Sequence, residues 1–156
     1  MKRRSFLKQA AAGVAAGAVA APAIAQSMPT IQWRLTSSFP KSLDTIFGAS
    51  EIFAKALSDM TEGKFQVRVF AAGEIVPGLQ VLDAVQNGTV EMGHSAAYYY
   101  IGKEPALAFG TCLPFGFNAR QHMAWKLYGG GNEAMAPLYK EYGITHFPCG
   151  NTGVQM

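Results

Sequence analysis

Residues 64–95 read KFQVRVFAAGEIVPGLQVLDAVQNGTVEMGHS, and the pattern of this stretch decides the fold class of the 156-residue chain. Apolar and polar residues alternate over residues 64–70, which predicts a half-buried strand. A short helix closed by Asn87-Gly88 follows, with apolar residues at helical spacing: Leu79, Leu82 and Val85. Residues 90–95 predict a buried strand, so the stretch alternates strand, helix and strand.

The residues before this stretch extend the same alternation. Residues 31–37 predict a first strand, because apolar residues alternate with polar ones: Ile31, Trp33 and Leu35. Ser42 is the predicted N-cap of a helix with an apolar face, and Gly63 is its predicted C′ residue. This order of strands and helices is typical of an α/β fold, with a parallel-rich sheet flanked by helices.

The residues after it predict two further helices and a strand. Asn118 and Gln121 fit a capping box at the start of one helix, which ends at the glycines 129–131. The predicted apolar face of that helix holds Met123, Leu127 and Tyr128. Asn132 is the predicted cap of the next helix, and residues 144–149 predict a fourth strand.

Small and aromatic residues follow the predicted strands at their carboxyl ends, where ligands bind in open parallel sheets. Phe39 follows the first strand and is a candidate for a pocket wall, with core packing as the alternative. Three tyrosines follow the third strand. If this run is extended, Tyr98 and Tyr100 face one way and Tyr99 the other. Tyr100 is the candidate pocket residue of the run.

Residues 1–25 have the layout of a secretory signal. Basic residues precede an uncharged stretch over residues 10–25, which ends in the small-residue pattern Ala23-Ile24-Ala25. Residues 3–8 read RRSFLK, which is similar to the twin-arginine signal for the export of folded proteins. A membrane anchor is the alternative, but the stretch lacks the roughly 20 strongly apolar residues of a spanning helix. We therefore expect a mature chain that begins at Gln26 and resides in the periplasm.

The predicted mature chain is close to neutral. The whole chain has 13 basic and 10 acidic residues, and four of the basic ones lie within residues 1–8. No basic cluster remains in the sequence after the signal, which argues against a nucleic-acid partner or an anionic membrane surface. A near-neutral surface suits a protein that captures small solutes.

Residue types that carry common catalytic chemistry form no recognised pattern. The sequence has no G-x-S-x-G, no phosphate-binding loop and no histidine pair at the spacing of a zinc site. Cys112 and Cys149 are expected to be buried free thiols, with a disulfide as the alternative. An enzyme that pairs one of them with His94 or His146 is the competing functional hypothesis. A sensory ligand-binding lobe is a third hypothesis, against which the cleavable signal argues.

Two stretches resemble the solute receptors of tripartite ATP-independent periplasmic (TRAP) transporters, the DctP-type family. Residues 73–95 combine a Gly-Glu turn, a helix holding Asp-Ala-Val and a strand leading to the tyrosine run. Residues 150–156 read GNTGVQM and are similar to the crossover strand of the branch that binds α-keto and 2-hydroxy acids. The resemblance implies a two-lobed fold like that of type II periplasmic binding proteins, which closes on a small organic acid. It implies transport through membrane-embedded permease subunits, not catalysis, and it allows a homodimer of the full-length protein.

The resemblance also implies roles for residues near Met156. Gln155 matches a glutamine whose amide oxygen coordinates a cation bridging protein and ligand carboxylate, and such an oxygen suits Na⁺ or Ca²⁺. A strand glutamine bonded only to backbone is the alternative. Asn151 either donates to the ligand carboxylate or caps a turn. Residues 26–149 are then expected to form the first lobe, and residues 150–156 to begin the crossover to a second lobe, which lies past Met156 with the family's carboxylate-binding arginine.

Overall fold

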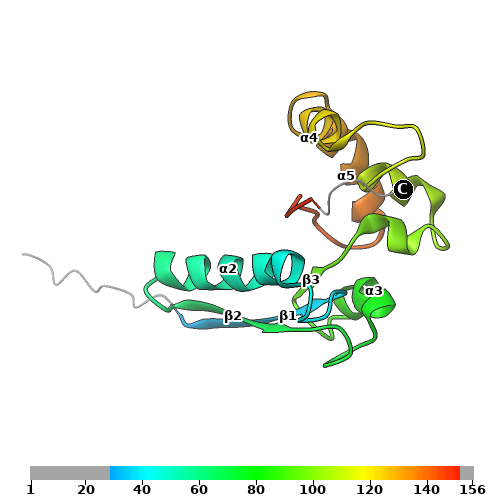
Figure 1. The fold of residues 1–156 in the computed structure, drawn as a ribbon. Coiled ribbons are helices and arrows are strands. Elements are labelled where there is room, and N and C mark those ends of the chain that lie inside the picture. Colours follow the sequence, from blue (N-terminus) through cyan, green and yellow to red (C-terminus); the bar gives the residue numbers. More distant parts are fainter. Residues whose placement is uncertain (1–28, 152–156) are drawn as a thin grey trace, which may run out of the picture.

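The computed structural model describes residues 29–151 (Figure 1). The predicted signal, residues 1–25, and Gln155 lie outside the described residues. No helix within residues 29–151 has both the length and the apolar character that crossing a membrane requires. The elements follow in this order: β1 (Ile31–Ser37), α2 (Asp44–Met60), β2 (Phe65–Phe70), η1 (Gly78–Gln80), α3 (Val81–Gln86), β3 (Met92–His94), η2 (Ala97–Tyr100), η3 (Pro105–Gly110), α4 (Ala119–Tyr128) and α5 (Gly131–Glu141).

β1 lies at the centre of a three-stranded parallel sheet with the strand order β2-β1-β3. The register places Ile31 beside Phe65 and Ser37 beside His94. Trp33 of β1 and Phe65 of β2 meet edge to face, with 4.9 Å between ring centroids. The predicted parallel α/β fold is confirmed. β1 spans the residues that the alternation predicted, and β2 differs by one residue, whereas β3 is shorter than predicted.

Helices cover both faces of the sheet. α2 packs on one face, where Ser50 Oγ of the helix lies 2.7 Å from His94 Nδ1 of β3. Successive strand residues point to opposite faces, so Gly93 points to the other face, where α3 packs against β3. A Cβ atom at Gly93 would lie 2.7 Å from Val81 Cγ1. The strand and α3 therefore approach each other too closely for a side chain at this position.

Both ends of α2 differ slightly from the prediction. The predicted cap Ser42 lies in a turn, which Leu43 N–H closes by donating to the Pro40 carbonyl at 3.1 Å. Leu43 is therefore the N-cap, and no side chain caps this end of the helix. At the other end Thr61 is the C-cap. Gly63, the predicted C′ residue, has a φ of 74° and lies one position past the actual C′ residue, Glu62.

The described chain divides in space into a sheet part, residues 31–94, and a helical part, residues 97–150 (Figure 1). An apolar cluster joins the two parts, because α3 contributes one residue to it while η2, η3 and α5 contribute the others. The buried members of this core cluster are Leu82, Tyr100, Leu107, Met135 and Tyr139.

α4 begins as predicted but buries a different face. The capping box is confirmed, because Gln121 N–H donates to Asn118 Oδ1 at 2.9 Å and Asn118 N–H donates to Gln121 Oε1 at 3.0 Å. The helix buries Lys126 and packs Trp125 against the core cluster. Two of the residues predicted for its apolar face are exposed instead: Leu127 and Tyr128. The contacts of Trp125 override the weak apolar periodicity of this short helix.

α5 begins at a glycine and not at the predicted asparagine cap. Gly130 is the N-cap and has a left-handed backbone with a φ of 81°. A Cβ atom at Gly131 would lie 2.7 Å from the Trp125 ring, so α4 and α5 meet closely here. Asn132 therefore lies inside the helix, and its predicted capping role is wrong.

The predicted fourth strand over residues 144–149 is wrong. No strand within residues 29–151 lies beside this segment, so its backbone has no ladder to join. It packs on α5 instead. The His146 ring stacks on Tyr139 with 4.5 Å between centroids, and Ile144 packs against the core cluster.

Candidate functional site

The carboxyl ends of β1 and β3 lie side by side and bring predicted site residues together. Ser38 N–H donates to the His94 carbonyl at 2.8 Å, which continues the strand pairing past β1. Beyond this point the Phe39 and Tyr99 rings lie 6.2 Å apart between centroids. We call the group the carboxyl-edge cluster, and it consists of Ser37, Ser38, Phe39, His94, Ser95, Tyr99 and Tyr100.

Hydroxyl groups form a connected chain within this cluster. Ser38 Oγ lies 2.6 Å from both the Gly78 carbonyl oxygen and Ser95 Oγ. Ser95 Oγ lies 2.8 Å from the Tyr100 hydroxyl, which also accepts the Leu82 N–H at 3.2 Å. The chain ties the ends of β1 and β3 to the start of α3. The three hydroxyl groups therefore hold the site together.

The tyrosine run forms the 3₁₀ helix η2 and is not extended, so the alternation of faces considered for an extended run does not apply. Its backbone turns because Tyr99 N–H donates to the Ala96 carbonyl at 3.1 Å. Tyr100 is only 6% exposed and belongs to the core cluster. The Tyr98 and Tyr99 rings meet edge to face at 4.6 Å. Burial, together with a hydrogen bond between the Tyr98 and Tyr99 hydroxyl groups, raises the pKa of Tyr99 to about 12.

Phe39 and His94 are packed together beneath this edge. Phe39 is 7% exposed, and its ring meets the imidazole edge to face with 5.1 Å between centroids. His94 Nδ1 lies 3.2 Å from Ser37 Oγ and 2.7 Å from Ser50 Oγ. Burial lowers the pKa of His94, so its imidazole is neutral near pH 7. His94 was not among the predicted pocket residues, although its place at the end of a predicted strand is a signal for this edge.

The Gly-Glu turn after β2 is closed by a carboxylate. Gly73 has a φ of 84°, and Glu74 accepts the Ala71 N–H and the Lys41 Nζ hydrogen, each at 2.7 Å. The hydrogen bond from Lys41, followed by the one from Ala71, lowers the pKa of Glu74. Glu74 therefore shapes the loop that borders the carboxyl edge.

The remaining predicted site residues lie at the end of the chain. Asn151 is exposed at the last described position, and Gln155 lies outside the described residues. The structure thus brings Phe39 and Tyr100 into one cluster without placing either relative to Gln155. Within residues 29–151, no group of three or more His, Cys, Asp or Glu side chains could hold a metal ion.

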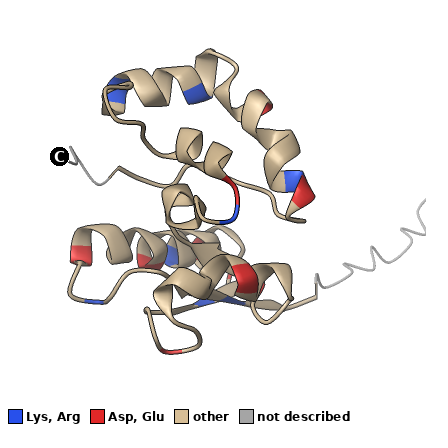
Figure 2. Ribbon diagram, turned by 90° about the vertical axis from the view of Figure 1, so that its right-hand side faces the viewer, with Lys and Arg blue, Asp and Glu red and all other residues tan. Residues whose placement is uncertain are grey.

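The two arginines of the sheet lie away from the carboxyl-edge cluster. Arg34 forms an ion pair with Glu91 at 2.9 Å, and Arg68 lies over the Phe70 ring at 4.9 Å from its centroid. Hydrogen bonds from Arg34 lower the pKa of Glu91 to about 2. Figure 2 shows basic and acidic residues distributed over the described elements without a large region of one sign.

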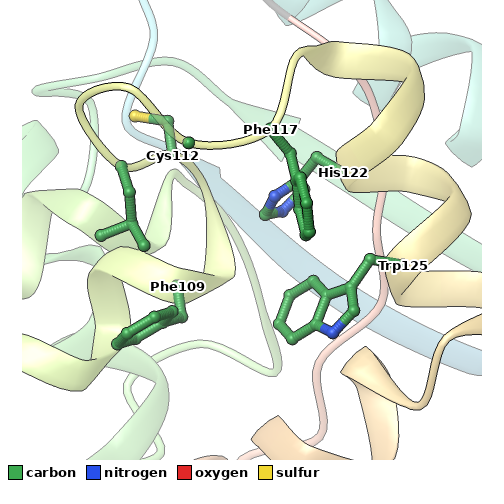
Figure 3. Close-up of a pocket in the computed structure, with 7 residues that line it drawn as sticks. Phe109, Cys112, Phe117, His122 and Trp125 are labelled. Atoms are coloured by element: carbon green, nitrogen blue, oxygen red, sulfur yellow. The ribbon is translucent and has the colours of Figure 1, made fainter.

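A separate apolar pocket of about 320 Å³ lies in the helical part (Figure 3). The Phe109, Phe117 and Trp125 side chains border it, and Cys112 and His122 also line it. The Cys112 sulfur points away from the His122 ring (Figure 3). This pocket brings a thiol and an imidazole near each other without the geometry of a nucleophile and its base.

The competing cysteine–histidine hypothesis finds no assembled site in the described part of the chain. Cys112 and Cys149 are free as expected, but both are exposed, so their predicted burial is wrong because they lie in surface loops. His94 is engaged by serines, and His146 Nε2 lies 3.5 Å from Lys126 Nζ. Burial and the nearby Lys126 lower the pKa of His146 to about 4.

A parallel sheet with helices on both faces, and a polar–aromatic cluster at its carboxyl edge, define an α/β lobe of the kind that binds small ligands. The sequence profile of the bacterial extracellular solute-binding protein family 7 (DctP) matches residues 36–156. The chain belongs to this family, and the resemblance to TRAP receptors seen in its sequence is confirmed.

Similar proteins agree with this family. The chain is 51% identical over its whole length to a monocarboxylate 2-oxoacid-binding periplasmic protein of Nostoc sp. and spans 44% of that protein. A TRAP solute-binding protein of Bordetella bronchiseptica, solved with calcium and picolinate, has 53% identity and a TM-score of 0.79 over 82% of this chain and 38% of its own. One of Pseudoalteromonas atlantica, solved with sodium and pyruvate, has 42% identity and a TM-score of 0.76 over 81% of this chain and 39% of its own.

Proposed function

We propose that this chain is part of a periplasmic receptor of a TRAP-type uptake system. The receptor captures a small 2-oxo or 2-hydroxy monocarboxylate and delivers it to membrane-embedded permease subunits. One observation carries the proposal: 51% identity over the whole chain to a relative named for binding monocarboxylate 2-oxoacids. The two solved relatives hold a small carboxylic acid together with sodium or calcium, which agrees with this class of ligand.

The carboxyl-edge cluster supports the proposal. It lies where parallel sheets bind ligands, and it combines an aromatic wall with hydroxyl groups held by hydrogen bonds. The charge of the chain after the predicted signal is near neutral, so attraction of a small anion depends on local groups and not on a basic surface. We assign Phe39 to the pocket wall and Tyr100 to the support beneath it.

The ligand carboxylate and its cation are assigned to the end of the chain. Asn151 donates its amide N–H to the carboxylate, and Gln155 offers its amide oxygen to Na⁺ or Ca²⁺. No carboxylate side chain belongs to the carboxyl-edge cluster, so the described residues alone do not form the oxygen cage that a hard cation needs.

Calorimetric titration of the full-length receptor with pyruvate and lactate tests the function. We expect a saturable, one-site isotherm and recovery of the ligand unchanged, because a receptor binds without catalysis. Absence of binding to every 2-oxo and 2-hydroxy acid tried would refute the proposal. Conversion of the ligand would instead support the enzyme hypothesis.

The domain assignment has its own test. We assign residues 1–25 to a twin-arginine signal, residues 26–149 to the first lobe and residues 150–156 to the start of the crossover strand. Fusion of residues 1–25 to a folded reporter should export it to the periplasm. The double substitution Arg3→Lys, Arg4→Lys should abolish export, whereas Lys8→Ala should retain most of it. Export that survives loss of both arginines would argue for another pathway.

A further inference from the structure

We propose that His94 is a positioning residue of the ligand pocket, which fixes the end of β1, and with it Phe39, against α2 and β3. The inference deepens the proposed function and rests on it, because it takes Phe39 as part of the pocket wall. His94 contacts Phe39 directly, and its effect on the ligand passes through that residue.

One imidazole nitrogen connects three elements of the fold. His94 is the last residue of β3, and its Nδ1 lies 3.2 Å from Ser37 Oγ of β1 and 2.7 Å from Ser50 Oγ of α2. Ser37 is fully buried and Ser50 is 2% exposed. Water therefore has little access to replace these contacts, and loss of Nδ1 would leave two buried hydroxyl groups short of a partner.

The same contacts continue to Phe39. Ser37 Oγ accepts the Phe39 N–H at 3.1 Å, so the hydroxyl group that meets His94 also holds the Phe39 backbone. The imidazole contacts the Phe39 ring directly, with 5.1 Å between centroids. His94 thus restrains both the backbone and the side chain of Phe39, by a hydrogen-bond route and a ring contact that substitutions can separate.

The surroundings of His94 require a neutral side chain. The groups that contact it are Ser37 and Phe39 from the end of β1 and Ser50 from α2, with Tyr99 of η2 packed behind Phe39. None of these carries a charge near pH 7. A partly buried polar residue with the right atom at the Nδ1 position therefore suffices for the role, and a proton is not needed.

Variants of the full-length receptor separate the two routes. His94→Asn places an amide atom near the Nδ1 position but removes the ring, whereas His94→Phe keeps a ring and removes the nitrogen. We expect His94→Phe and His94→Ala to weaken pyruvate binding by about tenfold, the effect of a lost buried hydrogen bond. His94→Asn should restore the affinity to within about threefold of wild type. His122→Asn is the matched control, because His122 is also a partly buried neutral histidine but lies in the helical part.

Calorimetry gives the affinities, and thermal unfolding without ligand gives the stabilities. Recovery of affinity by His94→Asn, but not by His94→Phe, at similar melting temperatures would support the positioning role. Equal affinity of the wild type and the three His94 variants, or affinities that simply follow the melting temperatures, would overturn the positioning role while leaving the receptor function in place. A wild-type receptor that binds no small carboxylate would overturn the proposed function itself.

Discussion

The sheet part and the helical part differ in how their polar groups are satisfied. The ion pairs within residues 29–151 lie in the sheet part, apart from the pair of Lys103 and Asp83, which joins the two parts. In the helical part, Lys126 is 4% exposed and faces a neutral histidine at 3.5 Å. Buried side-chain atoms without a hydrogen-bond partner within the described residues occur in both parts: Thr36 Oγ1 in the sheet part, and His122 Nε2 and the Tyr139 hydroxyl in the helical part. The ion pairs of the described residues are therefore concentrated in the sheet part, whereas the buried lysine of the helical part faces a neutral ring.

The largest expected effect tests whether the core cluster makes the two parts one cooperative unit. Leu107→Ala removes a side chain that is 2% exposed and should destabilise the receptor by about 2–5 kcal/mol. Urea unfolding checks this value, with hydrogen exchange at the β1 amides as a second probe. Leu127→Ala, at a half-exposed position of α4, is the control and should cost less than about 1 kcal/mol. Unchanged protection of β1 in Leu107→Ala would show that the parts unfold separately.

The next effect probes the tight packing of the sheet part. Gly93→Ala would place Cβ 2.7 Å from Val81 Cγ1 and 3.0 Å from Val85 Cγ2, and should cost about 1–3 kcal/mol. Gly48→Ala in α2 is the control, because its Cβ would meet nothing within 4 Å. That substitution should stabilise the helix by about 0.5–1 kcal/mol. Chemical denaturation of both variants gives the comparison, and equal effects would contradict the close approach of α3.

Acidification should destabilise the helical part through His146. Above about pH 6.5, the unfolded pKa, His146 is neutral in both the folded and the unfolded protein. Between about pH 6.5 and 4, His146 is protonated in the unfolded protein but stays neutral in the folded protein. Stability is therefore lost as the pH falls from about 6.5 to the folded pKa of about 4. We expect His146→Phe to remove about 1–2 kcal/mol of this loss. Urea unfolding between pH 8 and 4.5 measures it, and an identical slope in the variant would exclude His146 as the source.

The smallest effect distinguishes the cap that the structure uses from one that it does not. Asn118→Ala removes the side-chain half of the capping box and should cost about 1 kcal/mol. Asn132→Ala should change stability by less than about 0.5 kcal/mol, because Asn132 lies inside α5. Thermal unfolding of the two variants decides the point. A larger loss of stability in Asn132→Ala than in Asn118→Ala would instead support Asn132 as a helix cap.

Alternation predicted the sheet part well because each of its predicted strands has a paired neighbour in the described sheet. The pattern of Ile31, Trp33 and Leu35 located β1 without error. It failed for residues 144–149, because an alternating pattern makes a strand only beside another strand, and none of the described strands is there. The N-cap likewise lies at Leu43 and not at Ser42, because Leu43 N–H donates to the Pro40 carbonyl and closes a turn there. Residue propensity alone does not predict this hydrogen bond.

The candidate site was predictable in place but not in its details. The rule for parallel sheets located Phe39 and the tyrosine run at one edge. It did not reveal that Tyr100 turns into the core, or that Ser50 and His94 meet. Those two residues lie on different elements and are 44 positions apart, so only packing brings them together. Residues at the ends of neighbouring strands are foreseeable, whereas their partners on covering helices are not.

The two tryptophans of the chain fall one in each part. Trp33 packs edge to face on Phe65 in the sheet, and Trp125 lies against the backbone of Gly131 between α4 and α5. Each indole is therefore a built-in optical reporter for its own neighbourhood. Emission spectra of Trp33→Phe and Trp125→Phe would assign any ligand-induced change in light output to one region, without attaching a dye.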